Sequence, residues 1–243
     1  MLKIENVEIH GWEPAIRGMR NPKNSWANRD STDEENCDEC IYYADYTVCK
    51  YNHIHECLNF KAGSNDLELM TRLRNAGTEH RKFMRMIVVY MDVTAPLYWW
   101  KEYDTYKVGT VANSCSTMHK IADKEFTFDD FSHEKLIKSV CMESQEQHIR
   151  ISPIQALATT IECLNSYRDL YLQTKDKKYW WQMIQLLPSS YNQRRTIMLN
   201  YEVLANIYKS RRNHKLDEWH TFCDLIKSLS YSELITGKEE KND

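Results

Sequence analysis

The segment that most constrains the fold runs from Leu187 to Trp219, because its pattern changes twice within a short distance. An alternating run over Ser190–Leu199 predicts a β-strand that ends at Asn200. A helical pattern follows and ends in positive charge at Arg211, eleven residues after Asn200. A short polar connection, Asn213-His214-Lys215, then leads into a second apolar helix, whose first turn is acidic. A strand that feeds two such helices can hold an anionic ligand between helix ends.

Long regular elements are expected along the rest of the chain, because only 6 glycines and 5 prolines occur in 243 residues. No internal repeat and no linker divides the sequence, so residues 1–243 are expected to form one α+β, mostly helical domain with a disordered tail at 237–243. Besides the segment above, we expect strands at 3–11 and 86–93, a loop at 20–36, and helices from Asn65 to Gly77, over about 18 residues from Ser132, from Pro153, and over 179–187.

The composition is that of a folded protein, with 42% hydrophobic and 12% aromatic residues. The aromatic cluster from Tyr98 to Tyr106 is expected in the core or at a subunit interface. A net charge of -3 gives no overall attraction for nucleic acid or for an anionic membrane. No apolar run approaches the length of a membrane span, and no signal-peptide h-region follows Met1. We therefore expect a soluble cytoplasmic protein with no nucleic-acid and no membrane partner.

A Cys/His-rich insertion at residues 37–57 contains six possible metal ligands within 21 residues. Zinc requires four ligands in tetrahedral geometry, and a Cys-x2-Cys knuckle commonly supplies two of them. The sequence predicts one structural zinc per chain, held by four of the six. The alternative is a set of coincidental thiols in a variable loop. The six candidate ligands are Cys37, Cys40, Cys49, His53, His55 and Cys57.

Small and hydroxyl-bearing residues fill the run from Lys107 to Lys120, with basic residues at both ends. Backbone N–H groups at Gly109 can approach a phosphate closely, hydroxyls such as those of Ser114 and Ser116 can donate to it, and the lysines can neutralise it. The alternative is a turn of small residues between helices, since no defined phosphate-loop pattern is present.

The step Ala95-Pro96, followed by an aromatic helix start and this polar run, resembles the flavin-dependent thymidylate synthases. That family carries the signature R-H-R-x-x-S-x-x-x-x-S-x-R at about this distance. The chain departs from the signature, because it keeps one base, Lys107, together with hydroxyls. A shift of one residue offers Ser114 or Ser116 in place of a signature serine. Without gaps, the signature falls on Thr105, Tyr106, Lys107, Thr110, Cys115 and Thr117.

The C-terminal spacing resembles the same family more closely. Asn200 lies twelve residues after Pro188, Arg211 eleven residues later, and Lys215 four residues after that, with His214 beside it. The resemblance implies that Arg211 binds and activates a uracil ring as the catalytic residue. It implies that Asn200, His214 and Lys215 contact flavin, and that Lys107, Ser114, Ser116 and Arg211 bind the nucleotide. Ile184 and Glu202 stand where the family has arginines.

Each of these residues also has a purely structural interpretation. Arg211 can offset the dipole of a helix C-terminus, and Asn200 can cap the following helix.

The resemblance implies a small antiparallel sheet and a methyl or one-carbon transferase that acts on a dUMP-type pyrimidine nucleotide in dTMP biosynthesis. It further implies FAD, a reduced nicotinamide, a folate one-carbon donor and a homotetramer. One alternative is a non-catalytic nucleotide-binding or protein-interaction module that keeps the fold without the redox chemistry. Another is a helical protein held together by zinc, with no ligand pocket.

Overall fold

The computed structural model describes residues 2–35, 58–139 and 151–237, which gather in two compact units. The first unit contains residues 2–8, 90–139, 151–199 and 211–224. The second contains residues 9–35, 58–89, 200–210 and 225–237. The single-domain organisation expected from the sequence stays a prediction.

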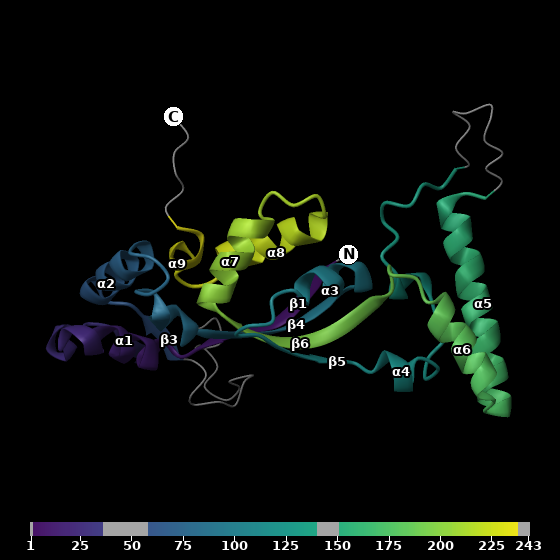
Figure 1. Cartoon of the computed structure of the whole chain (residues 1–243), viewed down its shortest axis with the longest axis horizontal. Helices are drawn as coiled ribbons and strands as arrows, with labels where there is room; N and C mark the ends of the chain where they lie inside the picture. The colour runs from purple at the N-terminus through teal and green to yellow at the C-terminus, as the bar shows by residue number, and fades with distance from the viewer. Residues whose placement is uncertain (1, 36–57, 140–150, 238–243) are drawn as a thin grey trace, which may run out of the picture. The chain divides into compact units, whose positions relative to one another are not determined.

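A four-stranded sheet has the strand order β1-β4-β6-β5 (Figure 1). The strands expected near 3–11, 86–93 and 190–199 are confirmed, as β1, β4 and β6. β5 pairs antiparallel with β6, with Val111 opposite Met198 and Ser114 opposite Arg195. It is a strand within the run for which we expected a phosphate loop or a turn. The bounds are Lys3–His10 for β1, Val88–Pro96 for β4, Val111–Ser114 for β5 and Asn192–Asn200 for β6.

The aromatic cluster that follows β4 lies in the core of the first unit. Trp99 and Trp100 on α3, Leu97–Tyr103, are at most 1% exposed. Trp99 packs against the buried Trp219 with ring centroids 4.7 Å apart. Trp219 comes from α8, Asp217–Ser228, so this contact fixes the beginning of α8 against α3. Of the two positions expected for this cluster, the core is confirmed for Trp99, Trp100 and Tyr103.

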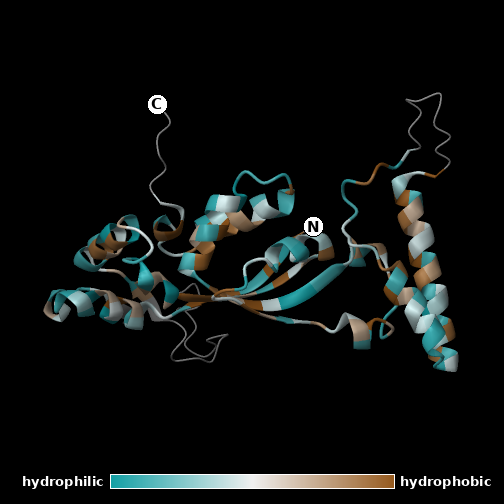
Figure 2. Cartoon of the chain, viewed as in Figure 1, coloured by the Kyte–Doolittle hydropathy of each residue, from teal (hydrophilic) through white to brown (hydrophobic). Residues whose placement is uncertain are grey.

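The first unit also contains a pair of packed helices, α5, Pro153–Thr174, and α6, Lys177–Leu186 (Figure 1). Ser152 and Gln155 form a capping box at the start of α5, and Lys175 ends it in the left-handed conformation with φ of 55°. Hydrophobic residues are spread along α5 among hydrophilic ones (Figure 2). The buried cluster at this pair contains Ile121, Ala122, Phe126, Phe131, Leu157, Ile161, Leu164 and Met183.

The prediction of a helix that begins at Ser132 is wrong for the described part of that segment, because residues 132–139 form no helix. The backbone N–H of Ser132 donates to the carbonyl of Ser190 at 2.8 Å, and Phe131 forms a β-bridge with Tyr191. The Ser132 hydroxyl donates to the Glu134 carboxylate at 3.0 Å. The bonds to Ser190 and Tyr191 tie the chain to the residues before β6 at the position where a helix would start.

The second unit is built on the helices α1, Trp12–Arg20, α2, Ser64–Asn75, and α7, Tyr201–Arg211, whose last residue belongs to the first unit. Trp12 stacks on Phe60 at 4.8 Å and meets the edges of Tyr201 and Tyr231. The segment 20–36, expected as a loop, instead contains two 3-10 turns and a strand. The other helical elements of the second unit are η1 (Asn21–Lys23), η2 (Trp26–Asn28), η4 (Lys82–Arg85) and α9 (Glu233–Thr236). This unit also contains the antiparallel pair of β2 (Thr32–Glu35) and β3 (Leu58–Lys61). The first unit further contains α4 (Thr117–Lys120) and η5 (Phe128–Asp130).

The α+β, mostly helical fold with a small sheet is therefore confirmed. Among the described residues, no helix has both the length and the apolar character required to cross a membrane.

Candidate functional site

Arg211 is the last residue of α7, as the sequence pattern predicted. Its Nη1 lies 2.6 Å from Oε2 of Glu102, and its Nε donates to the Tyr106 hydroxyl at 2.9 Å. The guanidinium also lies over the Trp219 ring, 4.9 Å from its centroid. Burial lowers the pKa of Arg211, but the hydrogen bonds and charges of Tyr106 and Glu102 outweigh it and raise the pKa above its ordinary value. The side chain is thus charged, and its orientation is set by partners on or just after α3.

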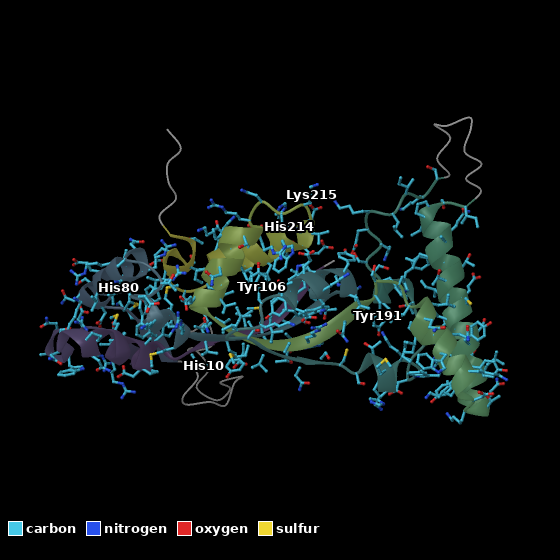
Figure 3. All side chains as sticks on the ribbon, viewed as in Figure 1. His10, His80, Tyr106, Tyr191, His214 and Lys215 are labelled. Atoms are coloured by element: carbon cyan, nitrogen blue, oxygen red, sulfur yellow. The ribbon has the colours of Figure 1, made fainter. Side chains whose placement is uncertain are left out.

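His214 lies beside this ion pair, and Figure 3 shows it with Lys215 in the segment between α7 and α8. Its Nε2 is 3.9 Å from Oε2 of Glu102. Its Nδ1 accepts a hydrogen bond from the backbone N–H of Leu216 at 3.2 Å. Since Nδ1 is the acceptor, the neutral ring carries its proton on Nε2, which faces the carboxylate.

A cleft opens next to this cluster and consists of two adjoining cavities that share Tyr98, Ser189 and Leu216. The cavity of about 690 Å³ is also lined by Glu102, the carboxylate that contacts Arg211. The cavity of about 680 Å³ is also lined by the exposed Lys215. Both volumes are within the range of small-molecule sites. Of the three residues singled out in the sequence, Lys215 therefore lines the cleft, whereas Arg211 and His214 lie behind Glu102, which lines it.

Tyr98 is the polar centre of the cleft, and no sequence pattern predicted a role for its hydroxyl. The hydroxyl donates to the Glu218 carboxylate and lies 3.1 Å from Oγ of Ser132. Burial and the hydrogen bond to Glu218 raise the pKa of Tyr98 to about 12. The phenol is therefore neutral at physiological pH. The acidic residue at the start of α8 was visible in the sequence, but its partner on α3 was not.

The nucleotide-binding residues predicted from the signature alignment are more scattered. Lys107 is exposed in the loop after α3, and Ser114 is exposed on β5. Ser116 is the N-cap of α4 and accepts the backbone N–H of His119 at 3.2 Å. Within the described parts of the chain, no hydrogen bond or ion pair joins these three residues to Arg211.

A base that sequence reasoning missed, Arg195, lies opposite Ser114 on β6. It pairs with Asp104 at 2.7 Å and lies over the ring of Trp100, 4.2 Å from the centroid. A basic pair, Arg194-Arg195, within an alternating strand was the available signal.

In the second unit, Asn200 takes the capping role that was one of its two interpretations. Its Oδ1 accepts the backbone N–H of Val203 at 3.0 Å. Its Nδ2 makes no hydrogen bond to any described residue and is free to donate. The flavin contact stays a prediction for this residue.

Glu202, which stands where the family has an arginine, is 7% exposed and bonded to two arginines. Its carboxylate lies 3.2 Å from Nε of Arg81 and also accepts from Arg85. Burial raises the pKa of Glu202, but the two arginines more than compensate, so the pKa lies below its ordinary value. The change of charge at this position is therefore balanced within the same unit.

All six predicted zinc ligands lie outside the residues that the structure describes. Among residues 2–35, 58–139 and 151–237, no group of three or more His, Cys, Asp or Glu side chains is arranged to hold a metal ion. The structural zinc stays a prediction.

The fold described above is that of the flavin-dependent thymidylate synthases. The structure of thymidylate synthase X (ThyX) from Helicobacter pylori with FAD and dUMP matches with a TM-score of 0.61 and 14% identity, over 97% of this chain and 97% of that one. The UMP/dUMP methylase PolB from Streptomyces cacaoi, bound with 5-Br UMP, matches with a TM-score of 0.55 and 11% identity, over 93% of this chain and 88% of that one. No family model and no curated protein matches the sequence. At sequence identities this low, the structural likeness establishes a shared fold alone.

Proposed function

We propose that this protein binds a pyrimidine nucleotide of the dUMP type together with FAD and acts as a methyl or one-carbon transferase of the thymidylate synthase type. The main support is the likeness, over 97% of both chains, to a structure whose ligands are FAD and dUMP. Arg211 adds support, because it lies beside a cleft and is the residue to which the sequence resemblance assigned the uracil ring.

Arg211 is suited to that role by its geometry. Its Nε and Nη1 are held by Tyr106 and Glu102, while its Nη2 makes no hydrogen bond to any described residue. The side chain is 15% exposed, so its charge acts in a region of reduced water content. A guanidinium held in this way can donate to a uracil carbonyl and stabilise negative charge that develops on the ring.

The donors expected to face a flavin fit that group chemically. Lys215 presents an exposed ammonium at the cleft, suited to an anionic part of the cofactor. Asn200 offers a free Nδ2 for a carbonyl of the ring. When bound, the flavin supplies hydride chemistry that no side chain provides. The exposed side chains of Lys107, Ser114 and Ser116 are accessible to a nucleotide phosphate. We also propose that the protein is a homotetramer, as the resemblance implies.

The test of this proposal is the absorbance spectrum of the purified protein, followed by calorimetry with FAD and dUMP. We expect a flavin band and binding of both ligands. Arg211→Ala is expected to weaken dUMP binding roughly 10- to 100-fold, as expected for loss of a charge-assisted hydrogen bond. Arg212→Ala removes the adjacent arginine and should leave the affinity within about twofold. Failure to bind either FAD or dUMP contradicts the proposal.

A second candidate is a nucleotide-binding module without redox chemistry. It is favoured by the Glu102 carboxylate on Arg211 and by the reversed charge at Glu202. In that case dUMP alone raises the melting temperature, and no flavin binds. Formation of methylated nucleotide from dUMP, a folate one-carbon donor and reduced nicotinamide rules this candidate out.

A further inference from the structure

We infer that the second unit contains a separate binding site for a phosphate-bearing anion, in a cavity of about 590 Å³ between the segment 20–29 and α2. Among the described residues, none lines both this cavity and the cleft near Arg211. Its lining is mostly polar and includes Lys23, Arg29 and Arg72. An apolar ligand therefore gains little from entering it, whereas an oxyanion meets several donors.

One residue that lines the cavity, Arg20, forms a buried ion pair with Asp66. Arg20 is 3% exposed and Asp66 is fully buried, with Nε of Arg20 2.6 Å from Oδ1 of Asp66. Arg20 also donates to the carbonyls of Ser25 at 3.1 Å and Asn28 at 2.8 Å. These bonds fix the backbone of the segment that carries Lys23 and Arg29. The site is therefore preformed, which lowers the entropic cost of binding.

The charges on the wall of the cavity are not balanced by other residues that the structure describes. Asp66 neutralises Arg20, and Glu13 pairs with Arg29 at 2.5 Å. Lys23 and Arg72 are exposed and have no ion-pair partner among the described residues. Among the described residues, Glu68 is the one acidic residue in the lining. After these pairs are counted, two cations face one carboxylate, so the described part of the lining has a net positive charge.

The neutral donors extend the same chemistry. The side-chain amides of Asn28 and Asn65 line the cavity and make no hydrogen bond to any described residue. Lysine serves as a point charge for phosphate, while an arginine fork matches two phosphate oxygens at once. The volume exceeds what a bare phosphate ion fills, so it accommodates a phosphate monoester with a sugar or nucleoside attached.

The experiment is calorimetry on the full chain at low ionic strength with three probes: inorganic phosphate, ribose 5-phosphate and AMP. We expect at least one probe to bind, and the double variant Lys23→Ala/Arg72→Ala to weaken it roughly tenfold or more. Glu68→Gln removes the opposing carboxylate and should strengthen binding about threefold. Lys209→Ala, which removes an exposed lysine of the same unit outside the cavity, should have no effect.

The probes also separate the possible sources of the anion. Tightest binding of phosphate identifies a site for the free ion, and tighter binding of either ester identifies a site that also contacts the attached group. Measurements on Arg211→Ala should retain the component that depends on Lys23 and Arg72. Absence of binding by all three probes overturns the inference, as does binding that is equal in the double variant. The side chains exchanged at Lys23, Arg72, Glu68 and Lys209 are exposed, so unchanged thermal unfolding confirms that these variants are folded.

Discussion

Asp92 on β4 is a carboxylate whose contribution to stability can be calculated from its surroundings. Its side chain is 16% exposed and accepts hydrogen bonds from the Thr196 hydroxyl, from Arg194 at 2.8 Å and from Asn6 at 2.8 Å. The Thr196 hydroxyl, Arg194 and Asn6, in that order, lower the pKa of Asp92 from 3.8 to about 2. The residue thus connects three neighbouring strands, β1, β4 and β6.

The pKa of Asp92 is lower in the folded state than in the unfolded one, so the unfolded chain takes up the proton at higher pH. The stabilisation is complete well above pH 4 and is lost as pH falls toward 2. At about 1.36 kcal/mol per pKa unit, it is about 2 kcal/mol at pH 7 and about 1 kcal/mol at pH 3. Asp92→Asn should therefore lower the free energy of unfolding by about 2 kcal/mol at pH 7 and by roughly half as much at pH 3.

Urea denaturation of both proteins at pH 7, 5, 4 and 3 measures this difference. Asp169→Asn serves as the control, because that carboxylate is 63% exposed and pairs with its neighbour Arg168. A destabilisation by Asp92→Asn that is the same at every pH would refute the reasoning, because the effect would then not come from the charge.

Three further predictions concern other parts of the chain. Glu202→Gln should lower the free energy of unfolding by about 2 kcal/mol at pH 7, because Arg81 and Arg85 lose their counterion. Since folding lowers the pKa of Glu202, this loss should become smaller in acid. A melting temperature equal to that of the parent at pH 7 contradicts this prediction. Asn200→Ala should cost about 1 kcal/mol through loss of the α7 cap, whereas Asn200→Ser should restore most of it; equal unfolding curves for the two variants would show that the cap contributes nothing. Elemental analysis of protein purified without added metal should find about one zinc per chain, and its absence removes the zinc prediction.

Elements with a local sequence signal were predicted well. The strand and the two helices that follow Pro188 occur as β6, α7 and α8, because alternation and helical periodicity depend on neighbours within a few residues. Arg211 falls at a helix end for the same reason. Pro153 is the first residue of α5, as predicted, because the preference of proline for a helix start is also a local signal.

Elements stabilised by distant partners were not predicted. Ser132 resembles a helix cap, but its backbone N–H donates to the carbonyl of Ser190, 58 residues away, and no helix follows in the described residues 132–139. The segment 20–36 was expected to be a loop, because the carboxylate that accepts hydrogen bonds from it, Asp66, lies on α2. The candidate site could not be predicted in full for the same reason. Glu102 lies 109 residues from Arg211, and no local pattern around either residue predicts their ion pair. Sequence spacing located the arginine, and only the fold revealed its partner.

The Glu102–Arg211 ion pair has a consequence for the measured affinity of any ligand that needs the whole guanidinium. Such a ligand binds only the fraction of molecules in which the carboxylate has moved away. Its apparent dissociation constant is the intrinsic constant divided by that fraction, so a protein that is open one time in ten binds about tenfold more weakly. A substitution far from the ligand that changes this fraction will change affinity without altering a single contact to it.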